Sequence, residues 1–221
     1  TLHVTRGDLV LNWNASLLEA VRATRSNPPL TARNLGMIHV AMYDAVASRE
    51  DWSPLVVTAV PPPPGSYSAL AAANQAAYAT AMTAFPSEAA RFQATLREGL
   101  DFLRSVGLSA QGIATGRGFG QRIANMILVA RADDGSKAAV EYVPSNQAGQ
   151  WRPTPPAFAP ALLPQWPAVK PIAVSNIATF RPPGPPELSS ETYAKELEEV
   201  RLLGSATNSI RTADQTDIAL F

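Results

Sequence analysis

The chain has 221 residues, of which 46% are hydrophobic and 16% are charged. This length can bury a substantial core, and this balance is typical of a folded protein rather than a disordered one. Eighteen basic residues match eighteen acidic ones, so the net charge is zero, and the sequence contains no basic block. A nucleic-acid partner is therefore not expected, because such binding depends on cations that neutralise phosphates.

The sequence also restricts membrane insertion and covalent cross-linking. No run approaches the roughly 18 uninterrupted apolar residues of a transmembrane helix, since Asn74, Gln75 and Thr80 interrupt the alanine-rich stretch. The absence of cysteine excludes disulfides and thiolate metal sites. The sequence starts at Thr1 rather than at methionine, which fits a removed signal peptide or tag, or an earlier start. We expect an exported protein, either periplasmic or secreted.

Helical spacing of apolar residues predicts five helices before residue 134. They cover residues 8–25, about 31–48, 66 or 68 to 85, 86–107 and 109–133. Asn27-Pro28-Pro29 is expected to end the first helix, because proline cannot continue one, and serines cap the third and fifth. No stretch alternates with the two-residue period of a strand, so the sequence predicts an all-α bundle.

Residues 134–188 show little periodicity and contain twelve of the twenty prolines. A structureless run of this length inside a compact domain is usually either functional or a linker. Its aromatic side chains argue against a free linker, because they would be costly to leave in water. These aromatic residues are Tyr142, Trp151, Phe158, Trp166 and Phe180. We therefore predict a long, irregular, proline- and tryptophan-rich arm that is ordered and wrapped over the bundle.

Two more helices are predicted after the arm. Ser189 or Ser190 caps one that runs to Gly204, and Thr212 begins another, which has no stop signal before Phe221. We expect this last helix to bury its apolar face against a missing C-terminal helical half. The predicted organisation is an N-terminal helical bundle over 1–133, the arm over 134–188, and a truncated start of the next helical segment over 189–221.

The two histidines are weak candidates for metal binding or base catalysis. His39 and Asp44 lie five residues apart and so on different faces of one helix, whereas ligand pairs on a helix prefer a spacing of three or four. His3 lies near the terminus. A hydrogen bond at a helix interface explains His39 better, and nothing supports it as the base of a Ser-His-Asp triad. We predict no metal ligand and no catalytic residue on this chain.

Two other motifs have structural explanations. Residues 116–120 (GRGFG) are rich in glycine like a phosphate loop, but they lie within a helical pattern and follow no strand. Small residues at a crossing between helices explain them better. The acidic residues between 196 and 199, with Lys195 and Arg201, are more simply the solvated face of a short helix than a catalytic carboxylate pair.

Trp151 and Arg152 are the best candidates for a role beyond packing. An arginine next to a tryptophan, fixed between prolines, can reach into a pocket or stack on a ring. Anchoring of the arm is the favoured role, because a long ordered loop needs such anchors. Contact with a ligand in a pocket is the alternative.

Five segments, which together span most of the chain, have familiar sequences. They are 34–46 (NLGMIHVAMYDAV), 131–136 (RADDGS), 149–170, 180–183 (FRPP) and 211–216 (RTADQT). In this order they resemble bacterial proteins related to vanadium-dependent haloperoxidases, which belong to the type 2 phosphatidic-acid phosphatase superfamily. The proline- and tryptophan-rich stretch is the most specific of the five.

The resemblance implies a helical bundle that binds vanadate or a phosphate ester in one pocket. In the family, lysine, arginine, a Ser-Gly-His turn and a further histidine form that pocket and stabilise a five-coordinate oxyanion. Its signatures are a lysine followed by Arg-Pro, a Pro-Ser-Gly-His segment and an arginine followed by a histidine. None occurs here, since Arg152-Pro153 and Arg181-Pro182 lack a suitably spaced lysine. In the family all three follow the segment that resembles residues 212–221.

The resemblance thus implies the N-terminal scaffold half of an enzyme that oxidises halide with hydrogen peroxide or hydrolyses phosphate monoesters. Vanadate would be a cofactor of the intact enzyme and would not bind this chain alone. The partners would be a C-terminal catalytic half, as a second chain or a nicked fragment, and a small-molecule substrate; a homo-oligomer is left open. The alternative is a self-contained, non-catalytic helical binding or structural module. Only the first hypothesis predicts a large exposed apolar patch.

Overall fold

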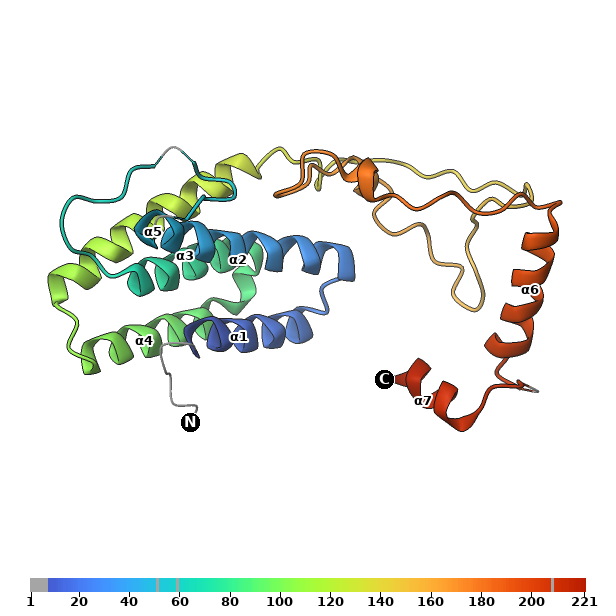
Figure 1. The fold of residues 1–221 in the computed structure, drawn as a ribbon, viewed down its shortest axis with the longest axis horizontal. Helices are drawn as coiled ribbons and strands as arrows, with labels where there is room; N and C mark the ends of the chain where they lie inside the picture. The colour runs from blue at the N-terminus through green and yellow to red at the C-terminus, as the bar shows by residue number, and fades with distance from the viewer. Residues whose placement is uncertain (1–7, 51, 59, 208) are drawn as a thin grey trace. The chain divides into compact units, whose positions relative to one another are not determined.

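The computed structural model describes residues 8–50, 52–58, 60–207 and 209–221 (Figure 1). Thr1 and His3 lie outside the described residues. The regular elements of the described residues are helices, with no strand among them, and this confirms the predicted all-α class. None of these helices is long and apolar enough to cross a membrane.

The chain divides into two compact units. The first unit is Thr1–Glu141 with Leu162–Ser175, and the second unit is Tyr142–Ala161 with Asn176–Phe221. The backbone therefore leaves the first unit after Glu141, returns at Leu162 and leaves again after Ser175. The three-part organisation predicted with boundaries after 133 and 188 stays a prediction.

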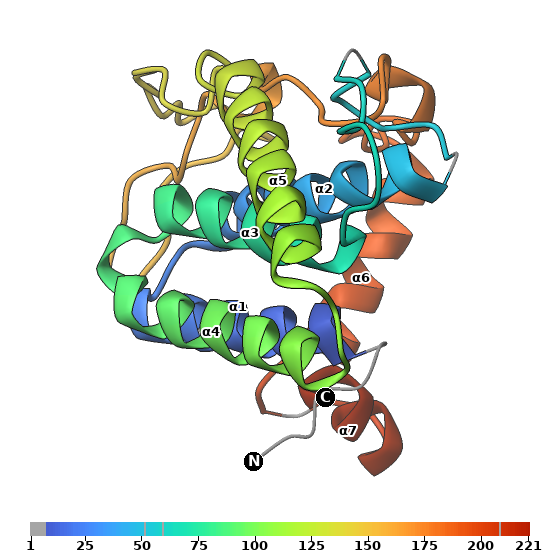
Figure 2. The same cartoon turned by 90° about the vertical axis from the view of Figure 1, so that its left-hand side faces the viewer.

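Five helices build the first unit, and the third of them is central. They are α1 (Asp8–Thr24), α2 (Pro28–Glu50), α3 (Ala69–Ala84), α4 (Ala89–Ser105) and α5 (Ala110–Ala130). The alanine-rich α3 contacts all four others. Figure 2 shows α1 beside α4, and α5 crossing over α3. Small side chains on α3 allow this close approach from several directions.

The crossing of α5 over α3 explains the glycines of residues 116–120. A Cβ added to Gly116 would lie 2.3 Å from the carbonyl oxygen of Ser68, and one added to Gly120 would lie 2.0 Å from that of Ala72. Gly118, on the exposed face of α5, has no such neighbour within 4 Å. The prediction of a helix crossing rather than a phosphate loop is confirmed.

Most of the helix starts that the sequence predicts are confirmed by side-chain N-caps. Ser68, Ser109, Ser190 and Thr212 each accept a hydrogen bond from a backbone N–H in the first turn that follows. The start predicted for α2 is wrong. Asn27 accepts from the N–H of Leu30, so the two prolines fill the first helical turn, where a backbone N–H has no helical partner to lose.

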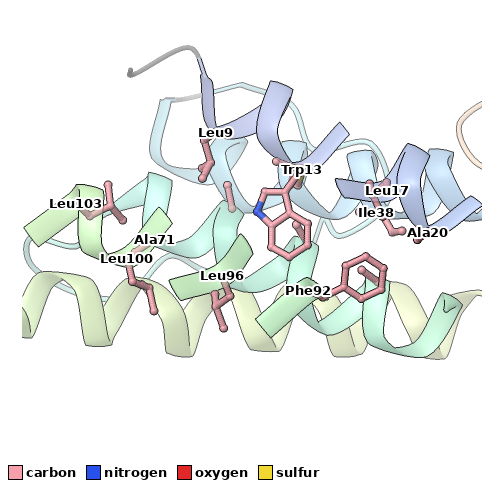
Figure 3. Close-up of a cluster of buried hydrophobic side chains, with 14 of the residues drawn as sticks. Leu9, Trp13, Leu17, Ala20, Ile38, Ala71, Phe92, Leu96, Leu100 and Leu103 are labelled. Carbon is pink, nitrogen blue, oxygen red and sulfur yellow. The ribbon is translucent and has the colours of Figure 1, made fainter. Parts of the chain in front are cut away.

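A buried polar pair stands within the apolar core between α1, α3 and α4. Trp13 is fully buried, and Figure 3 shows its ring next to that of Phe92. Its Nε1 donates to Oδ1 of Asn74 at 2.8 Å, and Nδ2 of Asn74 donates to the carbonyl oxygen of Leu96 at 3.1 Å. The amide therefore satisfies one donor and one acceptor that the surrounding apolar residues cannot.

We expect Asn74→Ala to lower the free energy of unfolding by about 2–3 kcal/mol, because it leaves the Trp13 N–H and the Leu96 carbonyl unpaired in the core. Urea denaturation measures this difference. Asn125→Ala, which removes an exposed amide from α5, is the control and should change stability by less than about 0.5 kcal/mol. Equal effects of the two substitutions would contradict this description of the core.

The second unit contains α6 (Glu191–Gly204), α7 (Ala213–Leu220) and a short turn of 3-10 helix at Ile177–Phe180. Thr212 and Gln215 form a reciprocal capping box at the start of α7. In α6, Glu198 pairs with Arg201 and both side chains are exposed. The charged residues of α6 thus form a solvated face, as the sequence predicts.

The residues of the predicted arm are divided between the two units. Its central part, Leu162–Ser175, belongs to the first unit, whereas both flanking parts belong to the second. Four of its five aromatic side chains are exposed, and the wrapping of the arm over the bundle stays a prediction. The exposed residues are Tyr142, Trp151, Phe158 and Phe180.

Candidate functional site: a buried arginine–aspartate cluster

The first unit contains a polar cluster of Arg33, Arg131 and Asp134, which we call the Asp134 cluster. Asp134 follows the end of α5 and is 1% exposed. Its Oδ2 accepts from Nε of Arg33 at 2.7 Å and lies 2.7 Å from Nη2 of Arg131. Its Oδ1 accepts from the backbone N–H of Ser136 at 3.0 Å. The carboxylate is therefore fully surrounded by donors.

The two arginines come from different helices and meet at the end of α5. Arg33 lies on α2, and its Nη2 donates to the carbonyl oxygen of Arg131 at 3.1 Å. Arg131 is the C-cap residue of α5. Because the last carbonyls of a helix lack partners and carry partial negative charge, a cation that donates to one of them stabilises the helix end. The cluster thus ties α5 to α2.

The same cluster holds the central part of the arm. Arg131 donates from Nη1 to the carbonyl oxygen of Pro171 at 3.0 Å and from Nη2 to that of Lys170 at 2.6 Å. The backbone N–H of Lys170 donates to the carbonyl oxygen of Asp134 at 2.8 Å. Gln165, also buried, donates to the carbonyl oxygen of Ser136 at 2.9 Å. Hydrogen bonds to the cluster and to the turn after it therefore hold Leu162–Ser175 against the bundle.

The surroundings of Asp134 lower its pKa. Burial alone would raise the pKa of this carboxyl group, but hydrogen bonds from Arg33 and Ser136, with the positive charge of Arg33, lower it from 3.8 to about 2. The group is therefore a carboxylate throughout the neutral and mildly acidic range. It is a structural anion and not a proton donor or acceptor for catalysis near neutral pH.

We expect the first unit to lose stability in a defined acid range. Because the folded state holds the pKa of Asp134 below its unfolded value, the carboxylate stabilises the fold above pH 3.8, and this contribution is lost as the pH falls toward 2. The loss is about 2 kcal/mol for this group. Urea denaturation of the wild type and of Asp134→Asn between pH 5 and 2 measures it. A difference between the two that stays constant over this range would contradict the assignment.

The Asp134 cluster does not fit vanadate or phosphate. An oxyanion site needs free cationic donors that converge on an open position, but here the carboxylate already lies between the two guanidinium groups. Nε of Arg131 is buried without a hydrogen-bond partner, yet one donor beside a buried carboxylate cannot hold an oxyanion. The contacts of the cluster join α2, the end of α5 and the segment Leu162–Ser175.

The structure places Trp151 and Arg152 in the second unit, with local contacts. The hydroxyl of Tyr142 donates to the carbonyl oxygen of Trp151 at 3.1 Å, and the two rings pack edge to face with centroids 5.4 Å apart. Nη1 of Arg152 lies 3.4 Å from the carbonyl oxygen of Asn146, a long hydrogen bond. The indole of Trp151 is 46% exposed. Anchoring and ligand contact by these two residues both stay predictions.

His39 and Asp44 serve different parts of the fold. Nδ1 of His39 lies 2.8 Å from the carbonyl oxygen of Leu35, one turn earlier in α2. Asp44 is fully buried, and its carboxylate accepts from the backbone N–H groups of residues 55, 56 and 57, so it fastens the loop after α2. Among the described residues no three histidine, cysteine or acidic side chains gather as a metal site would require.

Sequence reasoning did not single out Arg33 or Asp134. The only local signal was the Asp-Gly-Ser order of residues 134–136, which favours a turn in which the aspartate accepts from the N–H two residues on. The ion pair with Arg33 joins positions 101 residues apart, and no periodicity of one sequence reports such a contact. Arg131 and Asp134 did belong to a segment of the family resemblance.

No protein-family profile matches this sequence, and no curated protein does. Among solved structures, the fold is similar to one described as the crystal structure of the first bacterial vanadium-dependent iodoperoxidase. The two have a TM-score of 0.75 and 24% sequence identity over 96% of this chain and 54% of that chain. The chain therefore has a haloperoxidase-like fold, and it spans about half the length of the protein it matches.

Proposed function

We propose that this chain is the N-terminal scaffold half of an enzyme related to vanadate-dependent haloperoxidases and acid phosphatases. The observation that supports the proposal is the unequal coverage of the structural match. The match covers nearly all of this chain but only about half of the iodoperoxidase chain. A C-terminal catalytic half, as a second chain or a nicked fragment, would supply the rest. The reaction would be halide oxidation with hydrogen peroxide, or hydrolysis of a phosphate monoester.

The chemistry of the described residues supports a scaffold role. Both arginines of the Asp134 cluster pair with Asp134 and donate to backbone carbonyl groups. A pocket for a five-coordinate oxyanion needs several cations whose charge is free to act on it. On this proposal the lysine, the arginines and the Ser-Gly-His turn implied by the resemblance belong to the catalytic half, and so does vanadate.

Reconstitution of activity tests the proposal. This chain is combined with a polypeptide that carries a Ser-Gly-His turn and is encoded in the same reading frame or beside it. The mixture is assayed for iodide oxidation by hydrogen peroxide after addition of orthovanadate, and for hydrolysis of p-nitrophenyl phosphate without it. We expect one of these activities in the mixture and neither with this chain alone. Alanine in place of the histidine of the turn should abolish the activity.

The alternative of a self-contained module makes the opposite prediction. If no polypeptide with such a turn is encoded there, or if the mixture is inactive, the scaffold proposal is wrong. Intact mass spectrometry and size exclusion of the purified chain would then show a single folded species of 23.5 kDa that needs no second polypeptide.

A further inference from the structure

The second unit has no buried core of its own. None of its described residues is buried, and this includes every residue of α6 and α7. The first unit, by contrast, buries two apolar clusters, one around Trp13 and one around Phe119. A segment that orders its backbone must offset the lost conformational entropy by burying apolar surface. The second unit therefore needs a surface on which to fold.

One face of α6 offers the apolar surface for this contact. Tyr193, Leu197 and Val200 follow the i, i+4, i+7 spacing that places side chains on one face of a helix. Leu197 is 55% exposed and Val200 is 67% exposed. We call these three residues the α6 stripe. Lys195 and Glu198 lie on the opposite face. Such an amphipathic helix is suited to lie in an apolar groove of a partner protein.

The charge of the residues around the α6 stripe indicates which side chains surround the groove on the partner protein. Residues 187–221 contain seven acidic side chains and three basic ones, which gives a net charge of −4. The acidic residues are Glu187, Glu191, Glu196, Glu198, Glu199, Asp214 and Asp217. Complementary charge at an interface steers association and disfavours partners of like charge. A groove that receives α6 should therefore have basic side chains along its rim.

We infer that the α6 stripe is the docking surface for the catalytic half, and that the second unit folds only when it binds there. This inference rests on the proposed function, and it identifies the surface of this chain that binds the catalytic half. The occupant follows from the comparison, since nearly half of the similar iodoperoxidase chain has no counterpart in this one. The partner surface is an apolar groove with a basic rim. The first unit, with its own core, folds independently of it.

Hydrogen exchange and binding test the inference with the full chain and the Ser-Gly-His polypeptide described above. Alone, the chain should show fast amide exchange across α6 and slow exchange across α4, which packs on the core; in the mixture α6 should become protected. Leu197→Asp and Val200→Asp should each weaken binding about 30-fold or more, as loss of a central apolar contact does. Lys195→Asp places the same side chain on the opposite face of α6 and should bind like the wild type.

The outcomes separate the inference from the proposed function. If the mixture is active but Val200→Asp binds as well as Lys195→Asp, the docking surface is wrong and the scaffold role stands. Slow exchange of α6 in the isolated chain would also overturn the inference. So would a dimer of this chain that Val200→Asp dissociates, because a second copy would then cover the stripe. If the two polypeptides neither bind nor show activity, the proposed function is wrong and the inference fails with it.

Discussion

Asp134→Asn is expected to lower the free energy of unfolding by about 3–5 kcal/mol, the cost of removing one partner from a buried ion pair. The carboxylate of Asp134 lies between the guanidinium groups of Arg33 and Arg131 and is 1% exposed. Its loss leaves two positive charges together in a buried site. The substitution should also loosen Leu162–Ser175, because Arg131 fixes that segment through the carbonyl groups of Lys170 and Pro171.

Urea denaturation measures the loss of stability, and limited proteolysis reports the loosened segment. Asp101→Asn is the matched control, since Asp101 pairs with Arg104 at 2.6 Å but both side chains are exposed. Such a pair contributes less than about 1 kcal/mol. Similar losses for the two variants would show that Asp134 does not fasten the bundle to the arm.

Gly120→Ala is expected to destabilise the first unit by about 3 kcal/mol, although alanine is the better helix former. The added Cβ would lie 2.0 Å from the carbonyl oxygen of Ala72 and 2.9 Å from its Cα. These are backbone atoms of the central helix, so α3 and α5 must move apart and lose packing. Thermal or urea unfolding measures the effect.

Gly118→Ala on the same helix is the control. It should stabilise the protein by about 0.5–1 kcal/mol, because alanine has the higher helix propensity and a Cβ at this position meets no atom within 4 Å. The two substitutions are therefore expected to change the free energy of unfolding in opposite directions. Stabilisation by both would mean that α5 does not approach α3 as closely as the structure shows.

Much of the helical architecture could be predicted because its signals are local. Ser68, Ser109 and Thr212 cap their helices through hydrogen bonds from residues three positions away, and such bonds depend on short sequence patterns. The start of α2 at Pro28 differs from the prediction because proline can begin a helix as well as end one. In the first turn of a helix its missing N–H costs nothing.

The Asp134 cluster and the division into two units could not be predicted from local patterns. Arg33 and Asp134 lie 101 residues apart in the sequence and are brought together by the packing of α2 against α5. The exposure of Phe158 and Phe180 likewise depends on what lies next to them in space. Composition shows that such rings favour burial, but it does not show on which surface they are buried. On our proposal, the second unit, which contains both residues, folds only when it binds another polypeptide.

Light scattering coupled to size exclusion tests the central claim, that this chain is one half of an enzyme, most directly. The chain is mixed with the Ser-Gly-His polypeptide at equal concentration, and the mass of each eluting species is measured. Our account predicts a single one-to-one complex, heavier than the 23.5 kDa of this chain by the mass of its partner. Two separate peaks, with this chain eluting as a compact and fully folded monomer, would contradict it.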